Sequence, residues 1–133
     1  MASTTASSRE SPALNPLLEL SGLAHFGNIR PEHITPAIDA LLAAAHTAVA
    51  EATQTNLPAS WQTVVEPLEE ATDRLGRAWS AVAHMNAVVD TPELRAQYNA
   101  NLPRITAFWT ELSQNEVLYS RFKALAAAPE AAR

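Results

Sequence analysis

The sequence has no cysteine, only 3 glycines in 133 residues, and fewer basic than acidic side chains. The absence of cysteine excludes disulfide bonds and thiolate metal sites. It is typical of a cytoplasmic protein, which is the location we expect. The 9 Lys and Arg against 14 Asp and Glu give a formal net charge of -5, and no basic run occurs. We therefore expect no binding to nucleic acid and no adsorption to an anionic membrane.

No apolar run approaches the length of a membrane-spanning helix, and the first thirteen residues lack the apolar stretch of a signal peptide. These small, polar residues predict a disordered leader at residues 1–13. Leucines are frequent in residues 14–29, but Pro16, Gly22 and Gly27 interrupt any helical period. We expect an irregular segment with short turns that lays its large apolar side chains on a core. Those side chains are Leu17, Leu18, Leu20, Leu23 and Phe26.

Residues 61–89 have the clearest helical period in the chain. A mainly apolar row of residues, in steps of three and four, lies opposite a side of acids and arginines, and we expect burial of this row to stabilise the helix. The predicted row is Trp61, Val65, Leu68, Thr72, Leu75, Trp79, Val82, Asn86 and Val89. Ser60 is the expected N-cap, and Pro67 predicts either a kink or a regular helix that begins beside it. Thr72 is expected to bond the carbonyl one turn back, whereas Asn86 needs an outside partner if it is buried.

Prolines mark the limits of the helix before this one. Pro31 and Pro36 each suit the first position of a helix. We expect a single turn at residues 31–34, followed by a helix from residue 36 to about residue 54. Its predicted apolar row is Ile38, Leu42, Ala45 and Val49, with Leu41 and Ala48 beside it.

Two more helices follow in the sequence pattern. Thr91 is the expected N-cap of a helix over residues 92–113, in which Pro103 should produce a kink. Asn115 is the expected cap of a short helix that ends before Pro129. The predicted row of the longer helix is Leu94, Tyr98, Leu102, Ile105, Trp109 and Leu112, with Phe108 beside it. The predicted row of the shorter helix is Leu118, Phe122 and Leu125.

The predicted fold is therefore all-α: an antiparallel bundle of about four helices with an irregular N-terminal segment, because the connections are short and no period-two alternation occurs. We expect the helical region to span residues 14–128. Residues 129–133 are expected to be a tail, and its lack of a capped end is typical of a truncated chain.

No motif that supports chemistry is present in the sequence. The four histidines, His25, His33, His46 and His84, lack the His-Glu-x-x-His spacing of a zinc site, and each is interpreted as an ordinary surface or core histidine. Glu69 and Glu70 lie among arginines on a polar helix side, which favours a solvated face over an acid/base pair. We predict no catalytic, cofactor-binding or metal-binding residue in this chain. The aromatic residues at helical spacing are expected to pack in a core or an interface.

Five blocks of sequence carry a resemblance to a known family. They are NPLL at residues 15–18, IRPEHITPAI at 29–38, SWQTVVEPLEEATDRLGRAWSAVAHMNAV at 60–88, TPELRAQYNANLPRIT at 91–106 and QNEVLYSRFKAL at 114–125. In this order and spacing they resemble the N-terminal segment of the oligopeptidase A group in the thimet-oligopeptidase family of zinc metallopeptidases. The resemblance covers nearly all of residues 15–125 and leaves out the leader.

The resemblance implies a clam-like, mostly helical parent enzyme that admits short peptides into a deep channel and cuts them. It also implies a zinc ion held by a His-Glu-x-x-His helix and a further Glu, all outside this segment. The N-terminal helices would form part of one channel wall. The expected partners are then the rest of the parent chain and, in the full-length enzyme, short peptide substrates.

Two hypotheses follow. In the first, this chain is the N-terminal helical, channel-wall region of a zinc oligopeptidase and binds no zinc itself. In the second, it is a free-standing helical module that binds a partner and performs no catalysis. Both predict that these 133 residues alone hydrolyse no peptide.

Overall fold

The computed structural model describes residues 15–19 and 26–127, and within these residues it contains helices and turns but no strand. Four α-helices follow one another: α1 (Pro31–Ala52), α2 (Glu66–Val88), α3 (Pro92–Ser113) and α4 (Glu116–Ala127). A short 3₁₀ turn, η2 (Phe26–Asn28), precedes α1, and a π-helical turn, η3 (Trp61–Val65), leads into α2. The predicted all-α fold is confirmed. None of these described helices is long and apolar enough to cross a membrane.

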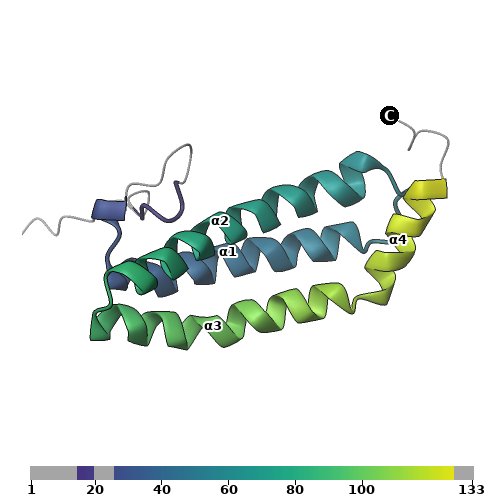
Figure 1. The fold of residues 1–133 in the computed structure, drawn as a ribbon. Helices are drawn as coiled ribbons and strands as arrows, with labels where there is room; N and C mark the ends of the chain where they lie inside the picture. The colour runs from purple at the N-terminus through teal and green to yellow at the C-terminus, as the bar shows by residue number, and fades with distance from the viewer. Residues whose placement is uncertain (1–14, 20–25, 128–133) are drawn as a thin grey trace, which may run out of the picture.

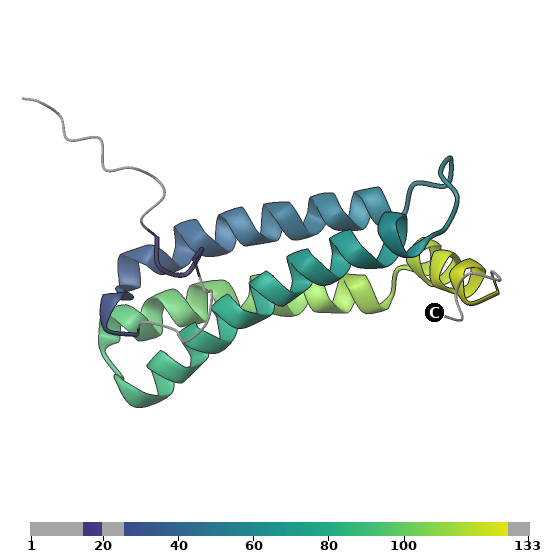
Figure 2. The same ribbon diagram turned by 90° about the horizontal axis from the view of Figure 1, so that it is seen from above.

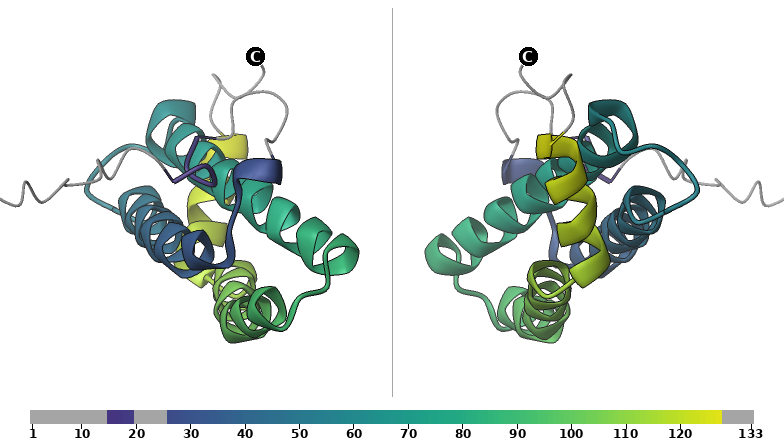
Figure 3. Two further views of the ribbon diagram at one scale, coloured as in Figure 1. Left: turned by 90° about the vertical axis from the view of Figure 1, so that its left-hand side faces the viewer. Right: turned by 90° about the vertical axis from the view of Figure 1, so that its right-hand side faces the viewer.

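The three long helices lie side by side, with α2 antiparallel to α1 and α3 (Figure 1). α1 packs against both of the others, and its contact with α2 is more extensive than that between α2 and α3. The short helix α4 does not run along the bundle as a fourth member. It lies across one end, from the end of α3 toward the start of α2 (Figures 2 and 3).

α1 begins earlier than the sequence pattern predicted. The expected break before Pro36 is wrong, because a single helix runs from Pro31 through Pro36 to Ala52. Proline removes one backbone donor, and the burial of apolar side chains on both sides of it offsets that loss. The neighbouring side chains without exposed surface are Ile34, Ala37 and Ile38.

Polar contacts fix the start of α1. The backbone N–H of Arg30 donates to Nδ1 of His33 over 3.0 Å, and the side chain of Asn15 donates to the carbonyl oxygen of His33 over 2.9 Å. The second bond ties the N-terminal segment to the helix. Leu17 of that segment is buried in the core and Leu18 packs against it, as predicted. Residues 1–14, Leu20, Leu23, His25, the side chain of Phe26 and residues 128–133 lie outside the described part of the chain.

The entry into α2 contains the largest departure from the predicted row. Ser60 is the predicted N-cap, since its Oγ accepts from the Thr63 N–H over 3.2 Å. The regular helix begins at Glu66, beside Pro67, which is the second of the two predicted alternatives. A π turn holds one more residue than an α turn, so η3 rotates its residues out of phase with α2. Val64 is therefore buried and Trp61 is 54% exposed. The predicted burial of Trp61 is wrong.

The rest of the predicted α2 row is largely correct. Leu68, Leu75 and Val82 are buried, but the buried face also includes the smaller side chains Ala78 and Ala81 and the flexible Met85. The Thr72 hydroxyl donates to the carbonyl of Leu68, as expected. Asn86 Oδ1 is buried without a hydrogen-bond partner among the described residues. Val89 is exposed, against prediction, because it lies just beyond the last turn of the helix.

The turn between α2 and α3 is defined by two polar side chains. Asp90 has φ 43°, in the left-handed region that a short polar side chain tolerates. Its carboxylate accepts a hydrogen bond from Arg95, and this bond, followed by the charge of Asp90, raises the pKa of Arg95. Thr91 caps α3 by accepting from the Leu94 N–H over 3.2 Å, as predicted.

α3 keeps its predicted bounds but not all of its predicted buried row. It continues through Pro103 to Ser113, and the expected kink stays a prediction. Leu94, Ile105 and Phe108 are buried, whereas Leu102 and Trp109 are exposed. Their predicted burial is wrong.

In α4, as in α3, the buried side of the helix differs from the predicted one. Asn115 Oδ1 accepts from the Leu118 N–H over 2.9 Å, so the predicted cap is confirmed. Leu118 is buried, but Phe122 is exposed and Arg121 is buried instead. Leu118 joins a small second core with Ala52, Val64 and Leu68, which closes the end of the bundle.

Candidate functional site

A polar network joins the first turns of α1 to the middle of α3. Its centre is Asn101, which is 1% exposed. The Asn101 side-chain amide donates to Thr35 Oγ1 over 2.9 Å and to the Gln97 carbonyl over 2.8 Å, and its oxygen accepts from Arg104 over 3.0 Å. Thr35 in turn donates to the Gln97 side chain over 2.6 Å. Arg104 continues the network to the Asp39 carboxylate over 2.7 Å.

This network can set the alignment of the two helices. A buried amide that loses its partners is costly, so sliding α1 along α3 by one turn would break several bonds at once. The apolar contacts around it discriminate less between neighbouring alignments, because they are not directional. Sequence reasoning missed Asn101, although it continues the three- and four-residue spacing of Leu94, Tyr98 and Ile105.

A second polar link attaches α4 to the end of α1. The guanidinium of Arg121 donates through Nη1 to the carbonyl of Leu57 over 2.6 Å and through Nε to that of Ala52 over 3.3 Å. Ala52 is the last residue of α1, where carbonyl groups lack helical partners. A cation at a helix C-terminus is also favoured by the helix dipole. Arg121 Nη2 is buried without a partner among the described residues.

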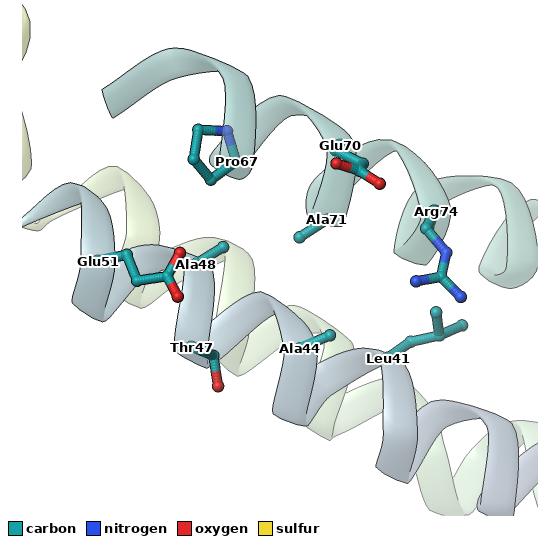
Figure 4. Close-up of a pocket in the computed structure, with 9 residues that line it drawn as sticks. All are labelled: Leu41, Ala44, Thr47, Ala48, Glu51, Pro67, Glu70, Ala71 and Arg74. Carbon is teal, nitrogen blue, oxygen red and sulfur yellow. The ribbon is translucent and has the colours of Figure 1, made fainter. Parts of the chain in front are cut away.

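A cavity of about 310 Å³ lies between α1 and α2. Figure 4 shows Glu51 reaching toward it from α1, with Glu70 and Arg74 on the α2 side. Its inner surface is apolar and includes Leu41 together with small alanines. The charged side chains at its rim are exposed to solvent, which screens their interactions. The cavity therefore offers space for an apolar group but no desolvated acid/base pair.

A smaller cavity, of about 70 Å³, lies between α1 and α3. His46 and Phe108 line it and meet edge to face, with ring centroids 5.3 Å apart. Glu111 and Asn115 also line it. It has room for about one or two waters, so it is too small for a substrate.

The residues that the structure describes do not form a zinc site. His33 bonds the backbone at the start of α1, His46 packs on Phe108, and His84 is on α2. In residues 15–19 and 26–127, no group of three or more His, Cys, Asp or Glu side chains lies close enough together to hold a metal ion. We therefore assign no step of a reaction to a metal held by this chain. Glu69 and Glu70 are both exposed on α2.

The four helices and the polar links between them define the class of this chain as an all-α helical domain. Comparison with known proteins identifies its family. Residues 38–133 match the model of the neurolysin/thimet oligopeptidase N-terminal domain, so the chain belongs to that domain family.

Curated relatives agree with this assignment. The chain is 40% identical over 111 residues to oligopeptidase A of Salmonella typhimurium, which covers 84% of this chain and 16% of the relative. It is 38% identical over the same length to oligopeptidase A of Haemophilus influenzae. A probable cytosolic oligopeptidase A of Arabidopsis thaliana is 36% identical over 123 residues, which is 92% of this chain and 17% of the relative. The chain thus spans about one sixth of the length of the relatives it matches.

Proposed function

We propose that this chain is the N-terminal helical, channel-wall region of a zinc metallo-oligopeptidase that cleaves short peptides. The observation that carries the proposal is the family match over residues 38–133, together with relatives that bear the name oligopeptidase A. In this proposal the zinc and its ligands belong to another part of the polypeptide, since the described residues bring no ligand set together. The domain supplies a rigid wall.

The contacts of the bundle suit that role. A channel wall must keep its shape while peptides pass, and directional hydrogen bonds hold one alignment better than apolar contacts alone. The network around Asn101 fixes α1 on α3, and Arg121 fixes α4 on the end of α1. Together they make one rigid unit from helices that are far apart in the sequence.

A hybrid enzyme tests the proposal. The matched 111-residue segment of Salmonella typhimurium oligopeptidase A is replaced by the corresponding residues of this chain. The hybrid is expected to fold and to cleave short peptides in a reaction that a zinc chelator stops. The free 133-residue chain is expected to cleave none. An inactive but folded hybrid, or zinc-dependent turnover by the free chain, would contradict the proposal.

The coding sequence offers a second test. An open frame beyond the codon for Arg133, with a His-Glu-x-x-His motif downstream, is the expected result. A natural stop codon immediately after that position would favour the alternative, a free-standing helical module that binds a partner without catalysis. We also propose a cytoplasmic location. Fractionation of cells that express the natural gene checks it, and recovery of the protein in another compartment would refute it.

A further inference from the structure

One row of α3 faces neither of the other long helices. Tyr98 stacks on Trp79 of α2 with ring centroids 5.0 Å apart, which marks the side of α3 that faces α2. The ion pair between Arg104 and Asp39 marks the side that faces α1. A third row, in steps of three and four, is exposed from residue 99 to the end of the helix. Its members are Asn99, Leu102, Thr106, Trp109 and Ser113, and we call it the α3 seam.

The α3 seam has the properties of a surface made for a second helix. None of its five members carries a charge, and depletion of charge is typical of the centre of an interface. Large side chains at 102 and 109 alternate with smaller ones, which suits interdigitation with a facing helix. The Ser113 hydroxyl already donates to the carbonyl of Thr110, so covering it loses little hydration. Figure 3 shows α3 at the lower edge of the bundle, with α1 and α2 above it.

The size of the seam helps to identify its occupant. Fifteen residues of α-helix extend about 21 Å, so a strip about 10 Å wide covers only about 200 Å². A stable dimer of separate proteins needs about 800 Å² on each partner. A segment of the same polypeptide needs far less, because the covalent connection gives it a high effective concentration. The matched segment is 16% of the Salmonella typhimurium relative, so most of that polypeptide lies outside it and can supply such a segment.

We propose that the α3 seam is the docking site of an apolar helix from the remainder of the oligopeptidase polypeptide. Trp109 and Leu102 are the two anchors, and the three small polar residues let the partner helix approach closely. This inference rests on the proposed function, because it takes the occupant from the longer protein. It goes beyond that proposal by specifying which surface of the domain the rest of the enzyme covers.

The substitution Trp109→Glu tests the seam in two settings. In the free chain Trp109 is 40% exposed and its ring packs on Phe108 with centroids 5.3 Å apart, so the substitution should lower the melting temperature by about 3–5 °C. In the hybrid oligopeptidase the charge would be fully buried, and the melting temperature should fall by at least about 5 °C more than in the free chain, or the transition should split in two. The matched control is Trp61→Glu, which makes the same change at a tryptophan off the seam that is 54% exposed. It should lower the melting temperature of the free chain and of the hybrid by the same amount.

A second substitution and the unmodified hybrid separate the possible failures. Leu102→Glu should reproduce the pattern of Trp109→Glu. Two results would refute the proposed docking site. One is unfolding of the free chain by both substitutions, and the other is an equal loss of melting temperature for Trp109→Glu and Trp61→Glu in the hybrid. A dimer of the free chain that Trp109→Glu dissociates would assign the seam to a second copy instead. The unmodified hybrid could also cleave peptides while Trp109→Glu lowers its melting temperature no more than that of the free chain. The docking site would then be wrong, and the proposed function would stand. An inactive unmodified hybrid contradicts the proposed function itself.

Discussion

Replacing Asn101 by alanine should destabilise the free chain by about 2 kcal/mol. The substitution removes three hydrogen bonds, to Thr35, to the Gln97 carbonyl and from Arg104. At about 1 kcal/mol for each net bond, the loss is about 3 kcal/mol. The higher helix propensity of alanine returns roughly 0.6 kcal/mol. The loss of the Arg104 bond costs less than a fully buried bond would, because Arg104 keeps its ion pair with Asp39 and part of its side chain stays in water.

The matched control is Asn99→Ala, on the same helix and with the same change of side chain. Asn99 is exposed, so only the gain in helix propensity remains, and the control should stabilise the chain by about 0.5 kcal/mol. The expected difference between the two variants is therefore about 2.5 kcal/mol. Because both variants gain the same helix propensity, this difference measures the interactions of the buried amide alone.

Urea unfolding followed by far-UV circular dichroism gives both free energies, provided that the slope with denaturant is the same for each variant. A double-mutant cycle with Thr35→Ala then isolates the bond between the two helices, and a coupling of about 0.5–1.5 kcal/mol is expected. If the two asparagine variants differ by less than about 0.5 kcal/mol, the network does not hold α1 on α3. The helices would then be aligned by their apolar contacts instead.

Three further predictions concern the core, a cap and the end of the bundle. Leu75→Ala should cost about 2–5 kcal/mol in urea unfolding because Leu75 has no exposed surface. Leu102→Ala should cost only about 1 kcal/mol, because Leu102 is 37% exposed; equal losses would refute the assigned burial. Thr91→Ala removes the cap of α3 and should cost about 1 kcal/mol; an unchanged midpoint would show that the cap contributes nothing. Arg121→Met should speed amide hydrogen exchange in α4 more than in α2, because α4 loses its bonds to the end of α1; uniform protection would refute that link.

Local sequence signals determined where the helices lie. Ser60, Thr91 and Asn115 each cap the helix that follows. In each cap a side-chain oxygen accepts a hydrogen bond from a backbone N–H three residues further on, so the signal lies within one turn of sequence. The family resemblance also depended on blocks of consecutive residues, which can be recognised without knowledge of the fold, and the family match confirmed it. Pro36 was misjudged for the opposite reason. A proline lowers the helix propensity locally, while the burial that outweighs it depends on distant residues.

In α3 and α4, the face that packs inward was decided only by the tertiary structure. In α3, the steps from Tyr98 to Ile105 can pass through Leu102 or through Asn101, and both keep a spacing of three and four residues. In α4, the same choice exists between Phe122 and Arg121 on the way from Leu118 to Leu125. Hydrophobicity alone favours the apolar member of each pair, yet the polar member is buried in both cases.

The sequence by itself determined the helical class, most helix ends, the family and the lack of a zinc-binding motif, since all of these depend on residues close together in the chain. The tertiary structure decided that Asn101 and Arg121 are buried and that Trp109 and Phe122 are exposed. A buried amide or guanidinium is tolerated only where another helix supplies acceptors, and those acceptors, on Thr35 and Ala52, lie more than sixty residues away. No local pattern contains that information, because it arises from the way α1 meets α3 and α4.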